Sequence, residues 1–191
     1  MSTVSATSRR EQIIAVAAEL FSERGFHGVS ITDLGSALGT SGPALYKHFA
    51  SKDALLGEML VGISERLLAG GQLRTEQAAA AGPEAVLRAL VAWQVEFALA
   101  HPALITVHYR DLGSLTEEDS RTVRRLQRRY VECWVDAIVA TSGCDRAHAR
   151  SAAHVVFGLI NSTPHSARLC RTDMSALLQR MALAALDVTA P

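Results

Sequence analysis

Apolar residues recur every three or four positions along most of this chain, the spacing that gathers them on one face of an α-helix. Positions 13, 14, 17, 20 and 21 show the pattern clearly. Alternating apolar and polar residues between Asn-Gly turns, the signature of β-hairpins, are essentially absent from the sequence. The sequence therefore predicts an all-α protein with about nine helices.

Capping residues indicate where these helices begin, because Ser, Thr and Asp side chains accept hydrogen bonds from free N–H groups of the first turn. Such starts are predicted at Ser8, Ser30, Thr40 or Ser41, Ser51, Thr116, Asp145, and Thr172 or Asp173. Breaks are predicted at glycine and proline, at Gly25, Gly39, Gly70-Gly71, His101-Pro102, Gly143 and Pro164. Pro83 starts a helix to about Ala100, and the polar, alanine-rich stretch 72–82 is expected to be a hinge or loop.

Two short helices, 31–38 and about 41–49, are joined by a turn at Gly39, and an amphipathic helix precedes them. This order is typical of a helix-turn-helix, whose second short helix enters the major groove of DNA. The residues able to face inward are Leu34, Leu38, Leu45 and Phe49. The residues left facing outward are Thr40, Ser41, Gly42, Ala44, Lys47 and His48. Small residues there let the backbone approach DNA, while hydroxyl and N–H groups reach phosphates.

The runs SITDL (30–34), GTSGPALYKHF (39–49) and SKDALL (51–56) resemble the tetracycline-repressor family. Phe21 and Gly25-Phe26 match the family pattern too, so the resemblance covers residues 9–56. Gly35, Thr40 and Pro43-Ala44 depart from the usual residues of the family. These departures bear on base preference rather than on the fold.

The resemblance implies a helix-turn-helix DNA-binding domain over 1–50 and a helical effector-binding and dimerisation domain over 51–191. It implies phosphate contacts by Thr32, Tyr46 and Lys52, and residues that face the groove at Thr40, Ser41, Gly42, Ala44, Lys47 and His48. A member of this family is expected to be a homodimeric repressor that a small-molecule effector releases from a palindromic double-stranded DNA operator.

Large side chains are concentrated in the middle of the chain, although aromatic residues make up only 5% of it. The candidate ligand contacts among them are Trp93, Phe97, His108, Tyr109, Tyr130 and Trp134. A pocket needs apolar walls with a few polar groups, which Gln94, His108, Arg110 and Cys133 can supply. The alternative is a well-packed core without a cavity.

A cluster of arginines between positions 121 and 129 includes Arg125 and Arg128. It is either a solvated helix face or a site for an anionic ligand head. The segment 102–134 also faintly resembles regulators of fatty-acid metabolism in high-GC bacteria. Together these features suggest a fatty acyl-CoA, or another amphipathic compound, as the effector.

Two broad apolar faces near the C-terminus are expected to form the homodimer interface, as half of a four-helix bundle. The residues are Ala152, Ala153, Val155, Val156, Leu159 and Ile160, then Leu177, Leu178, Met181, Leu183, Ala184 and Leu186. The same faces can also belong to the core of one chain, and both interpretations can be partly true.

The composition bears on DNA binding and on the expected location of the protein. The formal net charge is +0 and the pI is about 7.1, so DNA binding has to come from a local arrangement of charge. Three cysteines without C-x-x-C spacing suit a reducing cytoplasm, and neither a signal peptide nor an apolar run long enough to span a membrane is evident.

No motif in the sequence suggests catalysis, a metal site or a cofactor. Cys133 and His154 lack the surroundings of a nucleophile and its base, and no His or Cys pair has ligand spacing. The competing interpretation is a helical protein-interaction module without DNA binding, against which Tyr46 and Lys52 argue.

Overall fold

The computed structural model describes residues 8–187, and within that range the chain is helical with no strand. The helices are α1 (Arg9–Arg24), α2 (Ile31–Ala37), α3 (Gly42–Leu45), α4 (Lys52–Ala78), α5 (Pro83–Ala100), α6 (Pro102–Asp111), α7 (Glu117–Ser142), α8 (Arg146–Ile160), α9 (Thr163–Ser166) and α10 (Arg171–Asp187). Two short 3₁₀ turns, η1 (Ala79–Ala81) and η2 (Leu112–Ser114), follow α4 and α6. The predicted all-α fold is confirmed.

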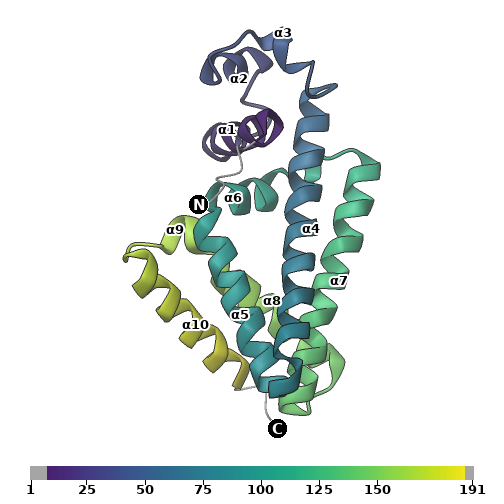
Figure 1. The fold of residues 1–191 in the computed structure, drawn as a ribbon, viewed down its shortest axis with the longest axis vertical. Coiled ribbons are helices and arrows are strands. Elements are labelled where there is room, and N and C mark those ends of the chain that lie inside the picture. Colours follow the sequence, from purple (N-terminus) through teal and green to yellow (C-terminus); the bar gives the residue numbers. More distant parts are fainter. Residues whose placement is uncertain (1–7, 188–191) are drawn as a thin grey trace, which may run out of the picture.

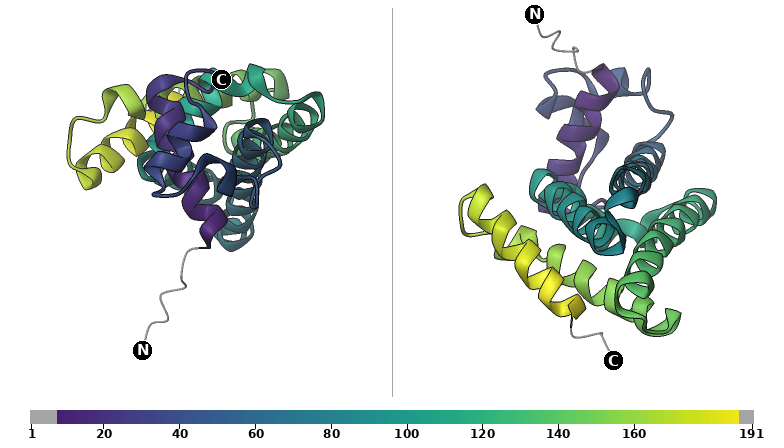
Figure 2. Two further views of the ribbon diagram at one scale, coloured as in Figure 1. Left: turned by 90° about the horizontal axis from the view of Figure 1, so that it is seen from above. Right: turned by 60° about the horizontal axis from the view of Figure 1, so that its bottom comes forward.

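The molecule is elongated, with α1, α2 and α3 at one end (Figure 1). The long helix α4 runs from that end through the body, where it packs against α5 and α7. Helices α8 and α10 pack on each other, and α10 also packs on α5, away from α1–α3 (Figure 2). Helix α6 crosses beneath α1 and is the main contact between the two ends of the molecule.

Capping explains most of the helix boundaries. Ser8 and Glu11 form a complete capping box at α1, and Ser30 and Asp33 form another at α2. The Ser30 hydroxyl and backbone N–H both bond the Asp33 carboxylate, which lowers the pKa of that group. Gly143 ends α7 in the left-handed backbone conformation, with φ of 74°, which residues other than glycine rarely adopt. These starts and stops were predicted.

The predicted end of α4 at Gly70-Gly71 is wrong, because the helix continues to Ala78. A Cβ on Gly70 would lie 2.2 Å from Cζ2 of Trp93, and one on Gly71 would lie 2.5 Å from Cε2 of Tyr130. The two glycines therefore let large side chains of α5 and α7 lie against α4. The expected loop at 72–82 is accordingly helical as far as Ala81, and the break comes at Gly82.

Helix α3 is shorter than predicted and ends at Leu45 instead of near Phe49. Beyond it, the N–H groups of Tyr46, Lys47 and His48 each bond the carbonyl three residues earlier. This is the tighter 3₁₀ pattern, and one α-type bond, from the N–H of Phe49 to the carbonyl of Leu45 at 3.0 Å, closes the segment.

The bend predicted at His101-Pro102 is confirmed, because α5 meets the α6–η2 segment at 92°. Proline at 102 lacks an N–H, so it starts α6 where that donor would have had no partner. Within residues 8–187 no single helix is long and apolar enough to cross a membrane, although the bent pair of α5 and α6–η2 satisfies the length and composition test together.

Candidate DNA-binding surface and effector cavity

The two short helices of the helix-turn-helix pack unusually closely. Leu34 and Leu45 are buried between them and α1. A Cβ on Gly35 would lie 2.6 Å from the backbone nitrogen of Gly42, so a larger residue there would push α3 away. Gly42 is itself buried, with Ile31 only 3.2 Å from where its own Cβ would lie. The prediction that Gly42 faces outward is therefore wrong, and its backbone serves the packing of α2 on α3.

The opposite side of this unit is open to solvent. Thr32, Ser41 and Lys47 are exposed, and the Tyr46 side chain is 53% exposed. The remaining outward residues, Thr40, Ala44 and His48, are half-buried. A tyrosine exposed to this degree is available to donate a hydrogen bond to a phosphate.

Lys52 is the first residue of α4, and its ammonium bonds other parts of the protein. Its Nζ donates to the backbone carbonyls of Phe26 and Val29, both at 2.8 Å, and lies 4.3 Å from the centre of the Phe26 ring. The ammonium thus ties the loop between α1 and α2 to the start of α4. The structure thus gives Lys52 a positioning role within the protein, and its phosphate contact stays a prediction.

Arg10 was not predicted to have a specific role, and it acts in a similar way. Its Nη1 donates to the carbonyl of His48 at 2.6 Å, and the guanidinium pairs with Glu58 and lies 4.5 Å from the Phe49 ring centre. Arg10 therefore joins α1, the end of the helix-turn-helix and α4. Sequence spacing offers no signal for this contact, because the partners are 38 and 48 residues away.

The body of the molecule contains a cavity of about 210 Å³, open to solvent on one side and lined by residues of α4, α5, α6, α7 and α8 with its C-cap. Its lining residues are Ser64, Leu67, Gln94, His108, Gln127, Tyr130, Val131, His154, Phe157 and Asn161. Of the predicted ligand contacts, His108 and Tyr130 line this cavity.

The other predicted aromatic contacts lie outside the cavity. Trp93 packs on α4, where its indole N–H donates to the carbonyl of Leu67 at 3.2 Å, and Phe97 is buried beside it. Trp134 is fully buried behind the cavity wall, with its ring 4.9 Å from that of Phe157. Tyr109 is 91% exposed, so its predicted ligand contact is wrong. Trp93, Phe97 and Trp134 support the wall rather than line it.

Arg125 and Arg128 are exposed on α7 and do not line the cavity. The residues of α7 that do line it, Gln127, Tyr130 and Val131, are on a different face of the helix. The two arginines are thus on the solvated face, which was the alternative reading of the cluster. The predicted anion site at the cavity mouth is not formed by them.

A directional chain of hydrogen bonds crosses the cavity wall. The Tyr130 hydroxyl donates to Oε1 of Gln94 at 2.9 Å, and Nε2 of Gln94 donates to Oδ1 of Asn161 at 3.0 Å. Burial raises the pKa of Tyr130 far above its ordinary value, so the phenol stays protonated. Gln94 was one of the polar groups proposed for a pocket, whereas Asn161, 67 residues away, was not foreseen.

His108 and Gln127 form a second polar pair, with 2.5 Å between Nε2 of the ring and Nε2 of the amide. Burial lowers the pKa of His108, so its ring is neutral and Nε2 can accept from the Gln127 amide. The missed lining residues are Ser64, Leu67, Gln127, Val131, His154, Phe157 and Asn161. They come from three helices, α4, α7 and α8 with its C-cap Asn161, and no local pattern marks them.

Helix α6 connects the cavity with the DNA-binding end. Two residues after His108, Arg110 donates from Nη1 to the carbonyl of Ser22 at 3.1 Å and from Nη2 to the carbonyl of Phe21. Buried Asp111 pairs with the same guanidinium at 3.1 Å. Arg110 therefore satisfies carbonyls at the C-terminal end of α1, where a cation also complements the helix dipole.

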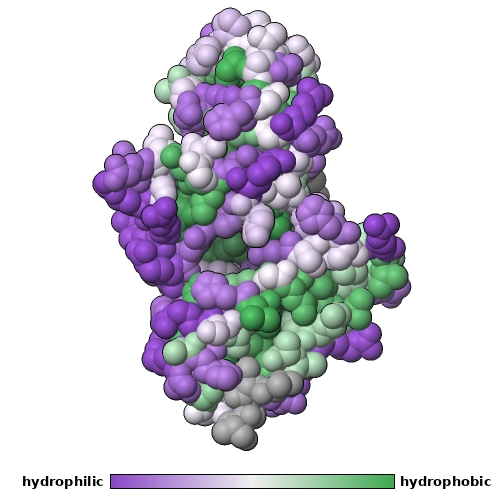
Figure 3. All heavy atoms as spheres, turned by 180° about the vertical axis from the view of Figure 1, so that it is seen from behind, coloured by the Kyte–Doolittle hydropathy of each residue, from purple (hydrophilic) through white to green (hydrophobic). Residues whose placement is uncertain are grey.

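The apolar faces of α8 and α10 divide into a buried half and an exposed half. Within the chain, Ala153, Val156, Ile160, Leu178 and Leu186 are buried, so these five residues belong to its core, which was the alternative, and the interface stays a prediction. Val155 and Met181 are 66% and 47% exposed. From behind, an apolar band crosses the lower half of the molecule over α8 and α10 (Figure 3).

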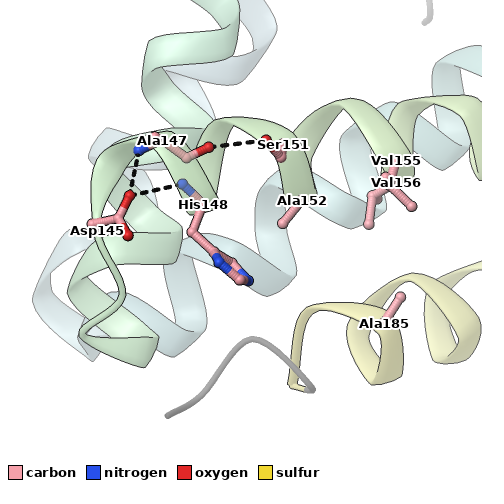
Figure 4. A pocket seen from close by; sticks show the side chains of 8 residues that line it. All are labelled: Asp145, Ala147, His148, Ser151, Ala152, Val155, Val156 and Ala185. Atoms are coloured by element: carbon pink, nitrogen blue, oxygen red, sulfur yellow. Dashed lines mark hydrogen bonds between the residues drawn. The ribbon is translucent and has the colours of Figure 1, made fainter.

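A shallow groove accompanies this band between the start of α8 and the end of α10. Figure 4 shows Ala152, Val155 and Val156 of α8 facing Ala185 of α10 across it. At its polar end, the Asp145 carboxylate caps α8 through the N–H groups of Ala147 and His148, which lowers the pKa of Asp145. In the described part of the chain, no group of three His, Cys, Asp or Glu side chains is arranged to hold a metal ion.

Proteins of known kind resemble this chain along most of its length. The transcriptional repressor KstR2 of Rhodococcus jostii (strain RHA1) is 28% identical over 135 residues, covering 70% of this chain and 65% of KstR2. The match thus spans just under two thirds of that relative. A TetR-family transcriptional regulator from Bordetella parapertussis 12822 superposes with a TM-score of 0.85 and 25% identity, covering 95% of this chain and 96% of that one.

A third protein, AibR, was solved in complex with isovaleryl coenzyme A and operator DNA. It has the same fold, with a TM-score of 0.67 and 20% identity over 91% of this chain and 97% of its own. Residues 13–59 match the family model for bacterial regulatory proteins of the tetR family, and residues 80–165 match the model for the tetracyclin repressor-like C-terminal domain. The helix-turn-helix end and the helical body are both matched, and the chain belongs to the tetracycline-repressor (TetR) family.

Proposed function

We propose that this protein is a homodimeric transcriptional repressor of the cytoplasm that binds a palindromic DNA operator and leaves it when a small-molecule effector enters the cavity. The observation that carries the proposal is the two-sided helix-turn-helix. Leu34 and Leu45 hold α2 and α3 together on the inside, while Ser41, Tyr46 and Lys47 are presented on the outside. The relatives named as repressors, and the operator complex of AibR, support the same function.

The proposed dimer uses the exposed residues of α8 and α10. Val155 and Met181 are large apolar side chains in contact with solvent in one chain. A second copy that packs on them completes a four-helix bundle and removes this apolar area from water. A dimer of this kind presents two copies of α3, which explains the expected twofold symmetry of the operator.

Release requires the effector to bind the DNA-incompetent arrangement more tightly than the competent one. The proposed route is α6, because His108 lines the cavity and Arg110 holds the end of α1. A displacement of α6 therefore changes the position of α1 and, through the packing of α1 on α2, the helix-turn-helix. The domain boundary near residue 50 is part of this proposal.

The test is binding of the purified protein to DNA from immediately upstream of its own gene, measured by fluorescence anisotropy with random-sequence DNA as competitor. We expect specific binding to exceed non-specific binding by about a thousandfold or more, and to weaken as salt is raised because phosphates are contacted. Equal affinity for upstream and random DNA at every salt concentration would contradict a repressor of its own gene. Absence of binding to all DNA would favour the helical interaction module.

A further inference from the structure

The cavity contains many polar groups but no carboxylate, lysine or arginine side chain. Seven of its ten lining residues are polar, and none is Asp, Glu, Lys or Arg. Burial lowers the pKa of His108, so this histidine is also uncharged, and His154 is exposed at the rim. A ligand with a formal charge would lose part of its hydration in this space without meeting a carboxylate, an ammonium or a guanidinium, which is costly.

The hydrogen bonds of the wall determine what the cavity offers to a ligand. Tyr130 donates to Gln94, and Gln94 donates to Oδ1 of Asn161. The carbonyl side of the Asn161 amide is thereby used, and its NH₂ group remains at the end of the chain. Ser64 donates instead to the carbonyl of Leu60 at 2.9 Å. The cavity therefore presents an amide donor from Asn161.

The apolar part of the cavity lining consists of aromatic rings and aliphatic side chains. Phe157 stacks on Tyr130 with 5.8 Å between ring centres and 17° between planes. Leu67 and Val131 complete an apolar surface beside these rings. The volume of about 210 Å³ is below the roughly 300 Å³ at which pockets for drug-sized ligands begin.

We propose that the effector is a compact, uncharged molecule with an apolar frame and a carbonyl oxygen that accepts a hydrogen bond from the Asn161 amide. A ketone, an ester or a primary amide has this chemistry. The inference rests on the proposed function, since it takes this cavity to be the effector site. It replaces the fatty acyl-CoA suggested by the sequence, because the arginines that would hold the phosphates do not line the cavity.

The experiment is calorimetric titration of the purified full-length protein with probes that share one frame. The neutral probe is 4-phenyl-2-butanone, its charged counterpart is 3-phenylpropanoate, and the large anionic probe is butanoyl-CoA. We expect the ketone to bind at least about tenfold more tightly than the carboxylate, because only the carboxylate must bury a charge. Butanoyl-CoA is expected to bind more weakly than the ketone.

Variants then test the assigned donor. Asn161→Asp keeps the shape of the side chain but replaces the NH₂ donor with an acceptor, and Asn161→Leu removes both groups. Each is expected to weaken ketone binding about fivefold or more. Gln77→Leu is the matched control, because Gln77 is an exposed amide outside the cavity lining. Circular dichroism of each variant confirms that the helical fold is kept.

Three results would overturn the proposal: carboxylate or butanoyl-CoA binding as tightly as the ketone, unchanged ketone affinity in both Asn161 variants, or no binding of the ketone. Operator affinity is measured separately without any probe. Loss of operator binding would contradict the proposed function, whereas the order of the probe affinities contradicts or supports only the chemistry of the cavity.

Discussion

The two ends of this molecule use polar side chains in opposite ways. In α1–α3, the hydroxyl, phenol and amine groups proposed to meet DNA stand on the outside of a small apolar core. In the body, polar side chains of α5, α6, α7 and the end of α8 point inward and bond one another around a cavity. The first arrangement suits a large partner that approaches from solvent, and the second suits a small molecule that must be enclosed.

Four of the cations are arranged the other way round. At the DNA-binding end, Lys52 and Arg10 are turned onto backbone carbonyls of the protein, where they hold neighbouring elements together. In the body, Arg125 and Arg128 are turned to solvent. A cation near a binding surface is therefore not by itself a ligand contact, and its hydrogen bonds decide its role. The following predictions test this contrast, from the largest expected effect to the smallest.

The largest effect is expected from the buried half of α10. Leu178→Asp places a carboxylate at a position that is 3% exposed, and we expect a loss of about 4 kcal/mol or more of folding free energy. Val155→Asp changes a residue that is 66% exposed, so the chain should fold and only self-association should be lost. Thermal unfolding and analytical ultracentrifugation distinguish the two. A folded, dimeric Val155→Asp variant would show that this face is not the interface.

The next largest effect separates a positioning lysine from a DNA-contacting one. Lys52→Ala removes two charge-assisted bonds to backbone carbonyls, so we expect about 2 kcal/mol of lost stability together with weaker operator binding. Lys47→Ala changes an exposed side chain and should weaken operator binding while leaving the melting temperature unchanged. Equal melting temperatures for both variants would contradict the structural role of Lys52.

A smaller effect is expected on communication between the two ends. Arg110→Ala removes the bonds from α6 to the end of α1, and we expect it to reduce the effector-induced loss of operator affinity by about 1 kcal/mol of coupling free energy. The measurement is operator affinity with and without a saturating effector. Arg88→Ala, which removes an exposed i,i+4 pair with Glu84, is the matched control. Unchanged coupling in Arg110→Ala would exclude this route.

The smallest effect is the acid sensitivity of His108. Burial lowers its folded-state pKa, so the unfolded chain binds a proton at higher pH than the folded chain. The related stability is complete above the ordinary histidine pKa of about 6.5 and is lost as the pH falls through the folded-state value. His108→Gln should therefore lose less in melting temperature between about pH 7 and pH 5 than the wild type.

His101 also contributes to the change of melting temperature with pH. Its pKa is also lowered, by burial and by the charges of Arg66 and Arg171, and this part of the acid sensitivity persists in the His108 variant. The same slope of melting temperature with pH in both proteins would show that His108 is not held neutral by its surroundings.

The sequence by itself determined the features that depend on neighbouring residues. Helix starts at Ser8, Ser30 and Asp145 and the stop at Gly143 follow from capping, which acts over three or four positions. The helix-turn-helix was predicted from short-range patterns too, because its inward and outward residues recur at helical spacing within two short helices. The family motif lies in this region as well.

Only the tertiary structure decided features that join distant positions. Gly70 and Gly71 look like a helix end in sequence, yet they make room for Trp93 and Tyr130. The bond between Gln94 and Asn161, and the carbonyl partners of Lys52, depend on how helices pack across the chain. Local patterns specify where a helix begins and which side is apolar. They do not specify which side chain from a distant helix packs against that apolar side. In this protein, the packing of distant helices formed the cavity.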